Sequence, residues 1–184
     1  MTSVIAHTFR CCACLLTLSI AAAAQAQAAA TTEAEDVCLM AVQAKAAEAD
    51  RTCSDQIARL RYDSASTANA PALAAALNNR AMARMNGGDL EGAAADLAES
   101  LALQPDAWAP YLNRATLALM TGDPGAALDD LGQLRDMLPT DSLAARAAAR
   151  NATLAWRMLG NPRAAEFQLN SERPIPLAPE PPPG

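Results

Sequence analysis

Two stretches of this chain are copies of one another. Residues 79–105 read NRAMARMNGGDLEGAAADLAESLALQP, and residues 113–139 read NRATLALMTGDPGAALDDLGQLRDMLP. Aligned without gaps, the two share Asn-Arg-Ala at the start, Gly-Asp near the middle and a closing proline, all 34 positions apart. A fixed interval of this length is typical of proteins that are built from stacked structural repeats.

Turn-forming residues divide each copy into two predicted helices. Gly88 and Gly122 tolerate the left-handed backbone that ends a first helix. Asp89 and Asp123 follow them, and an aspartate side chain can accept from the free N–H groups that begin a second helix. The proline that closes each copy cannot continue that second helix. Each copy therefore reads as a helical hairpin.

Small and large apolar residues recur at matching positions of the two copies. An alanine where paired helices cross lets the backbones approach closely, and leucine then fills the space between repeats. This spacing is typical of a core rather than of a binding site. The positions are Ala81, Ala93, Leu97, Leu101, Ala115, Ala127 and Leu131.

On these residues the pattern resembles the tetratricopeptide repeat. It departs from that family at Leu134, where a small residue is usual, and at Arg84 and Ala118, where an aromatic residue is usual. The resemblance implies an all-α fold, a short α-solenoid of helical hairpins. Its two clear repeats would span 74–105 and 108–139.

A third, degenerate repeat is predicted at 141–170. Residues 152–155 copy residues 115–118 at an offset of 37, and residues 160–162 copy residues 122–124 at an offset of 38. Relative to 34, about four residues have been added, close to one helical turn. The buried face of the helix would therefore be retained, and the repeats together would occupy 71–170.

The N-terminus is predicted to be an export signal. His7 and Arg10 precede an apolar stretch over 11–24, and Ala-Gln-Ala at 24–26 resembles a cleavage site. The apolar stretch is shorter than the roughly 20 residues that span a bilayer. We expect a cleavable signal peptide over 1–26, a periplasmic or secreted protein, and no membrane span after cleavage. An uncleaved anchor is the alternative.

Cleavage would leave two cysteines, Cys38 and Cys53, in an exported protein, and this suggests a disulfide. In one straight helix their Cα atoms would lie about 22 Å apart, whereas a disulfide needs roughly 7 Å or less. The pairing therefore predicts an N-terminal helical hairpin over 33–62 that turns near 50–52. Two buried thiols are the alternative. The hairpin also resembles those of small envelope tetratricopeptide proteins of Gram-negative bacteria.

Composition and charge argue against several function classes. The net charge is −6, and Lys45 is the single lysine, so the chain lacks the basic stripe of a nucleic-acid binder. The predicted cleavage removes the only histidine, which leaves no Ser-His or Cys-His pair and no histidine metal ligand. Gly87-Gly88 reads as a helix end rather than a phosphate loop. We expect no enzyme activity, no metal and no cofactor.

Two acidic or proline-rich segments receive structural interpretations. Asp129-Asp130 resembles a paired carboxylate, but neighbours on a helix point about 100° apart, and Asp130 repeats Asp96. We interpret them as a solvated helix face. Residues 173–184 carry six prolines, which predicts an extended, disordered tail. A ligand for a proline-binding domain is the alternative.

The first helix of each stacked hairpin would line a concave groove. Asparagine and arginine there can bind the backbone or a carboxylate of an extended peptide. The groove candidates are Asn78, Asn79, Met82, Leu112, Asn113, Thr116, Arg146 and Arg150.

Chaperone-binding members of the family hold a carboxylate in a clamp. Asn113 matches one clamp position, and Arg146 and Arg150 match two more when the third repeat is aligned through Ala152. The clamp is incomplete, because Asn78 and Met82 replace its first-repeat residues. Alternatively, the repeated asparagines and arginines, Asn79-Arg80 and Asn113-Arg114, bind neighbouring helices.

Two functions follow as hypotheses. The first is a non-enzymatic interaction module or scaffold that binds a peptide segment of an envelope protein in the groove. The second is a structural protein that self-associates into a homo-oligomer through its alanine-rich faces.

Overall fold

The computed structural model describes residues 37–45, 47–62 and 69–170, with only the backbone of 167–170. Within these ranges all regular structure is helical, so the all-α prediction is confirmed. A short helix at 37–43 comes first. The elements after it are α2 (Ala49–Tyr62), α3 (Ala70–Gly87), α4 (Leu90–Leu103), α5 (Trp108–Thr121), α6 (Pro124–Gln133), the 3-10 turn η2 (Leu134–Asp136), α7 (Leu143–Met158) and α8 (Pro162–Asn170).

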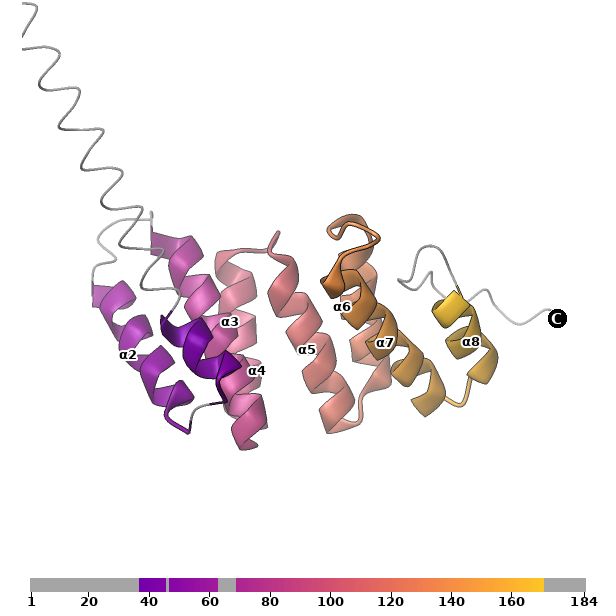
Figure 1. Cartoon of the computed structure of the whole chain (residues 1–184), viewed down its shortest axis with the longest axis horizontal. Coiled ribbons are helices and arrows are strands. Elements are labelled where there is room, and N and C mark those ends of the chain that lie inside the picture. The colour runs from indigo at the N-terminus through magenta and orange to yellow at the C-terminus, as the bar shows by residue number, and fades with distance from the viewer. Residues whose placement is uncertain (1–36, 46, 63–68, 171–184) are drawn as a thin grey trace, which may run out of the picture.

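From α2 to α8 the helices lie side by side in chain order along the length of the molecule, and the helix at 37–43 lies against α2 and α3 (Figure 1). From α2 to α8, each helix contacts the one that follows it. In addition, α3 contacts α5, and α5 contacts α7. We call α3, α5 and α7 the first helices, because each opens a hairpin. Their direct contacts bring side chains from successive hairpins onto one shared surface.

The turn chemistry predicted from the sequence is present in the hairpins. Gly88 and Gly122 adopt left-handed backbone with φ of 85° and 82°. Asp89 accepts a hydrogen bond from the Gly92 N–H, and Asp123 accepts one from the Ala126 N–H, each at 3.0 Å. Left-handed glycine ends the first helix and aspartate caps the second, so local sequence alone determines where each hairpin turns.

Substituting alanine at two glycines should change the free energy of unfolding in opposite directions. Gly122→Ala places a Cβ on left-handed backbone and should lower the free energy of unfolding by about 1–2 kcal/mol. Gly132 lies inside α6, where an added Cβ meets no atom within 4 Å, so Gly132→Ala should raise stability by about 0.5–1 kcal/mol. Urea denaturation of both variants measures the two effects, and effects of the same sign would contradict this assignment.

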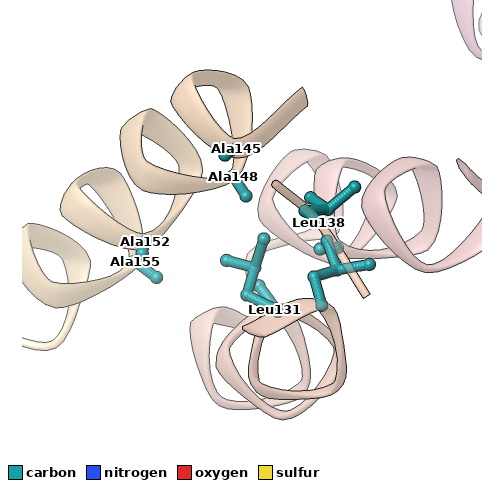
Figure 2. Close-up of a cluster of buried hydrophobic side chains, with 9 residues drawn as sticks. Leu131, Leu138, Ala145, Ala148, Ala152 and Ala155 are labelled. Atoms are coloured by element: carbon teal, nitrogen blue, oxygen red, sulfur yellow. The ribbon is translucent and has the colours of Figure 1, made fainter. Parts of the chain in front are cut away.

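The predicted small and large apolar positions form the core. Ala81, Ala93, Ala115 and Ala127 are fully buried, as are the large residues Leu97 and Leu131. In the C-terminal half, Leu131 and Leu138 face a row of alanines on α7, Ala145, Ala148, Ala152 and Ala155 (Figure 2). An alanine row lets α7 approach closely, and the leucines fill the remaining volume.

The second copy of the repeat departs from expectation near its end. Sequence predicted a helix that continues to Pro139, but α6 ends at Gln133 and gives way to the 3-10 turn. Leu134 in that turn is fully buried. A large residue therefore occupies the place of the usual small one, and the tighter turn places its side chain in the core.

The N-terminal hairpin is closed by its two cysteines. The sulfur atoms of Cys38 and Cys53 lie 1.96 Å apart, so the predicted pairing is present. The predicted turn near 50–52 is wrong, because α2 already begins at Ala49 and the chain turns between residues 43 and 49. Lys45 takes the positive φ of 51° in that turn. In an antiparallel helical hairpin, two residues such as Cys38 and Cys53 lie side by side only when the turn is midway between them in the sequence.

Several predictions concern residues outside the described ranges. These are the signal peptide at 1–26, the start of the hairpin at 33–36 and the proline-rich tail at 173–184. Among the helices that the structure does describe, none combines the length and apolar character needed to cross a bilayer.

Candidate functional site

The predicted groove residues all lie on the first helices. These helices are neighbours, because α3 contacts α5 and α5 contacts α7. The predicted residues are Asn78, Asn79 and Met82 on α3, Leu112, Asn113 and Thr116 on α5, and Arg146 and Arg150 on α7.

Polar side chains join successive first helices. The Asn113 Nδ2 donates to the Asn78 Oδ1 at 2.8 Å, and the Asn151 Nδ2 donates to the Thr116 Oγ1 at 2.9 Å. Asn113 therefore binds a neighbouring helix, as the alternative interpretation of the repeated asparagines proposed. Asn151 was not predicted. The feature that could have identified Asn151 is its distance in sequence from Thr116. Both hydrogen bonds join residues that are 35 positions apart.

The same spacing determines the register of α7. Since both bonds step 35 positions, α7 lies along α5 in the register in which α5 lies along α3. Arg150 then occupies the position on α7 that Thr116 occupies on α5. The sequence alignment through Ala152 instead makes Arg150 equivalent to Asn113. The additional residues of the third repeat lengthen α7 at its C-terminal end, to 16 residues against 14 in α5. Arg150 therefore lies one turn further along the surface than the clamp comparison implies.

Arginine and aspartate tie the two helices of each hairpin together. Arg80 binds Asp96 through two hydrogen bonds, at 2.8 and 2.6 Å, and Arg114 binds Asp130 at the same two distances. Asp96 and Asp130 are only 3% and 8% exposed. The predicted solvated helix face is therefore wrong for Asp130 and holds only for Asp129. The missed signal is an aspartate 16 residues after an arginine in both copies.

The first hairpin extends this pairing into a network. A second arginine, Arg84, donates to Asp96 at 2.9 Å and to Asp50 of α2 at 3.0 Å. Arg80 also donates to the Ser54 hydroxyl at 3.2 Å. Asp96 thus receives two guanidinium groups, and the network connects α2, α3 and α4.

The hydrogen bonds to buried aspartates raise the pKa values of two arginines, Arg80 and Arg114. The hydrogen bond with Asp96 raises the pKa of Arg80, and the one with Asp130 raises the pKa of Arg114, while burial acts in the opposite sense. A raised pKa stabilises the fold at every pH below the ordinary arginine pKa, and this contribution is lost only as the pH rises through the folded value. Neither arginine therefore makes stability depend on pH near neutrality.

Arg146 and Arg150 differ from these paired arginines. Both are exposed. Within the part of the chain that the structure describes, neither guanidinium makes a hydrogen bond or an ion pair. Their donors remain available to an external acceptor.

Exposed apolar side chains flank this region. Met120 lies four residues after Thr116 on α5 and is 51% exposed, and Leu154 lies four residues after Arg150 on α7 and is 48% exposed. Residues four apart share a helix face, so that spacing from the predicted residues could have identified both. We define the α5–α7 surface as Thr116, Met120, Arg146, Arg150 and Leu154.

The α3 part of the predicted groove is less accessible. Met82 packs against the cluster formed by Cys38, Val42, Ala49 and Cys53. Asn78 and Asn79 are buried. The N-terminal hairpin therefore covers the α3 end of the groove, and the α5–α7 surface is the accessible part.

A pocket of about 570 Å³ lies away from these residues, where the N-terminal hairpin meets the α3–α4 turn. Its lining includes Lys45, Asp50, Arg84 and Asp89, but no predicted groove residue. Arg84 there already lies 3.0 Å from Asp50 and 3.6 Å from Asp89, so its charge is compensated. In the described ranges, no three His, Cys, Asp or Glu side chains are grouped so that they could hold a metal ion.

Comparisons of the chain with protein-family models, with curated proteins and with solved structures found no match. The function must therefore be inferred from the residues of the α5–α7 surface and from the repeated hairpins that position them.

Proposed function

We propose that this chain is a non-enzymatic interaction module of the tetratricopeptide-repeat type that binds a peptide segment of a partner protein on its α5–α7 surface. The observation that carries the proposal is the pair of exposed, unpaired arginines beside exposed Met120 and Leu154. Guanidinium groups recognise carboxylates and backbone carbonyls, and apolar side chains supply buried area on binding.

The repeated hairpins support the assignment of repeat type. Each copy has a left-handed glycine, an aspartate cap and an Arg–Asp pair at equivalent positions. Stacked helical hairpins of this kind offer extended surfaces on their first helices, where peptides bind.

The non-enzymatic assignment depends on the residues available for chemistry. After the predicted signal cleavage the chain retains no histidine, and its two cysteines form the disulfide. The charged groups of the α5–α7 surface are the guanidinium groups of Arg146 and Arg150, and its residues include no carboxylate, imidazole or thiol that could act as an acid, a base or a nucleophile.

An exported location is part of the same proposal. Disulfides persist in oxidising compartments such as the periplasm, and the Cys38–Cys53 pair is consistent with that setting. Together with the predicted signal at 1–26, this favours a periplasmic or secreted protein, and the partner would be an envelope protein.

Site-specific photo-crosslinking tests the proposal. A photoreactive residue at Thr116 lies on the α5–α7 surface, and one at the exposed Ala58 of α2 serves as the matched control. In cells that express the chain, we expect a defined envelope protein to be crosslinked from position 116 and not from position 58. Leu154→Glu should reduce the yield at least tenfold. Equal yields from both positions would discard the surface.

Self-association is the second candidate function. Val37 and Met40 lie on the helix at 37–43 and are 50% and 56% exposed, so a second copy could cover them. Light scattering after size exclusion decides between the two, because a monomer at tens of micromolar removes this candidate and leaves the interaction module.

A further inference from the structure

The exposed face of α7 carries two parallel rows of side chains. One row is basic and consists of Arg146, Arg150 and Arg157. The other is apolar and consists of Leu143, Leu154 and Met158, which are 82%, 48% and 44% exposed. We call them the arginine row and the apolar row. Residues at intervals of four and eleven follow one stripe of a helix, so each row runs almost the length of α7.

The arginine row is an electrostatic exception in this chain. From residue 143 to residue 163 the sequence has four arginines and no acidic residue, although the net charge of the whole chain is −6. Arg80 and Arg114 of the other first helices are paired with buried carboxylates. Within the described residues, the guanidinium groups of Arg146, Arg150 and Arg157 have no such partner. A row of uncompensated cations attracts a partner of opposite charge.

We propose that α7 binds an acidic amphipathic helix of a partner protein. The partner's apolar side covers Leu143, Leu154 and Met158, and its carboxylates accept hydrogen bonds from the arginine row. This proposal rests on the interaction module proposed above, and it names the class of segment that the module takes.

The spacing of the two rows favours a helix as the occupant. Both rows advance about 6 Å for each four residues, along an α7 of 16 residues that is roughly 24 Å long. A partner helix that lies along α7 presents its own residues at the same intervals, so that its apolar and acidic rows stay in step with those of α7. Recognition is spread along side chains and does not require a free C-terminal carboxylate.

An anionic membrane surface is a poorer fit to the same chemistry. Of the apolar row only Leu143 is mostly exposed, and Leu154 and Met158 are half covered, so little apolar area could insert into a bilayer. Since residues 143–163 are basic and the whole chain is acidic, the remainder of the chain is more acidic still. That remainder would be repelled by anionic lipid headgroups.

The test uses the full oxidised chain and a synthetic peptide probe of 18 residues. The probe is acetylated and amidated at its ends, with leucines along one helical face and glutamates beside them, and a second probe replaces each glutamate by glutamine. Fluorescence anisotropy should show that the glutamate probe binds at least tenfold more tightly, and that added salt weakens it. Arg146→Glu with Arg150→Glu should weaken it at least tenfold.

Two exposed arginines of α2 provide the matched control. Arg51→Glu with Arg59→Glu makes the same charge change away from α7 and should alter probe affinity by less than twofold. Circular dichroism confirms that both double variants fold, and Arg146→Gln with Arg150→Gln replaces the glutamate variant if it does not.

Three results would overturn the proposal. The first is equal affinity for the glutamate and glutamine probes. The second is an equal loss of probe affinity in the α2 and α7 double variants. The third is binding only to vesicles of phosphatidylglycerol and phosphatidylcholine and not to the probe. If any of them occurs while Thr116 still crosslinks a partner, the interaction module stands and only the acidic-helix inference fails. If the crosslink at Thr116 is also absent, the module itself is discarded.

Discussion

Asp96→Asn should lower the free energy of unfolding by about 3–5 kcal/mol, the cost of removing one partner of a buried ion pair. The Asp96 side chain is 4% exposed and receives both Arg80 and Arg84. The amide keeps the size of the carboxylate but not its charge, so Arg80 loses its counterion in a poorly hydrated place, and Arg84 loses one of the three carboxylates around it. Guanidinium chloride denaturation of the oxidised chain measures the loss.

Two aspartates of α6 provide matched controls. Asp130→Asn removes the equivalent carboxylate of the second copy, but Arg114 is 41% exposed and can be rehydrated, so the loss should be about 1–2 kcal/mol. Asp129→Asn changes an exposed neighbour and should have an effect within about 0.5 kcal/mol. Equal losses at 96 and 130 would contradict the role of the second arginine, Arg84.

Replacing both Cys38 and Cys53 by serine should cost about 3 kcal/mol, because the cross-link closes a loop of 15 residues and restricts the unfolded chain. The effect should also be local. The helix at 37–43 is held to α3 through the cluster that includes both cysteines and Val42.

Denaturation with and without reductant, together with amide hydrogen exchange, checks this prediction. Reduction of the wild-type chain should reproduce the loss seen in the serine variant, and the helix at 37–43 should lose protection before α5 and α7. A loss below about 1 kcal/mol, or uniform loss of protection over all helices, would show that the disulfide does not hold this hairpin in place.

Much of the fold was predictable because the ends of the helices are determined by residues that are neighbours in the sequence. Gly122 and Asp123 together end one helix and begin the next whatever surrounds them, and the same holds for Gly88 and Asp89. Repetition of the pattern 34 residues later then indicated stacked hairpins. The prediction misplaced the turn of the N-terminal hairpin, because that segment has no such glycine. Its turn is determined by the need to bring Cys38 and Cys53 side by side.

The candidate site was predictable only in part. The sequence placed Asn113, Arg146 and Arg150 on first helices, which is where they lie. It could not show that Asn113 is already bonded to Asn78, or that α7 keeps the register of α5 and so moves Arg150 by one turn. Register depends on how two helices pack, and a repeat with four added residues has more than one plausible alignment.

The sequence by itself determined the helical class, the hairpin turns, the alanine and leucine core and the choice of Cys38 and Cys53 as partners. Each depends on backbone preference or on spacing within one short segment. Only the tertiary structure decided that Asp96 and Asp130 are buried counterions, that the N-terminal hairpin covers Met82, and that the arginines of α7 remain unpaired. These properties depend on which side chains from distant segments come within hydrogen-bonding distance, and spacing along the chain does not contain that information.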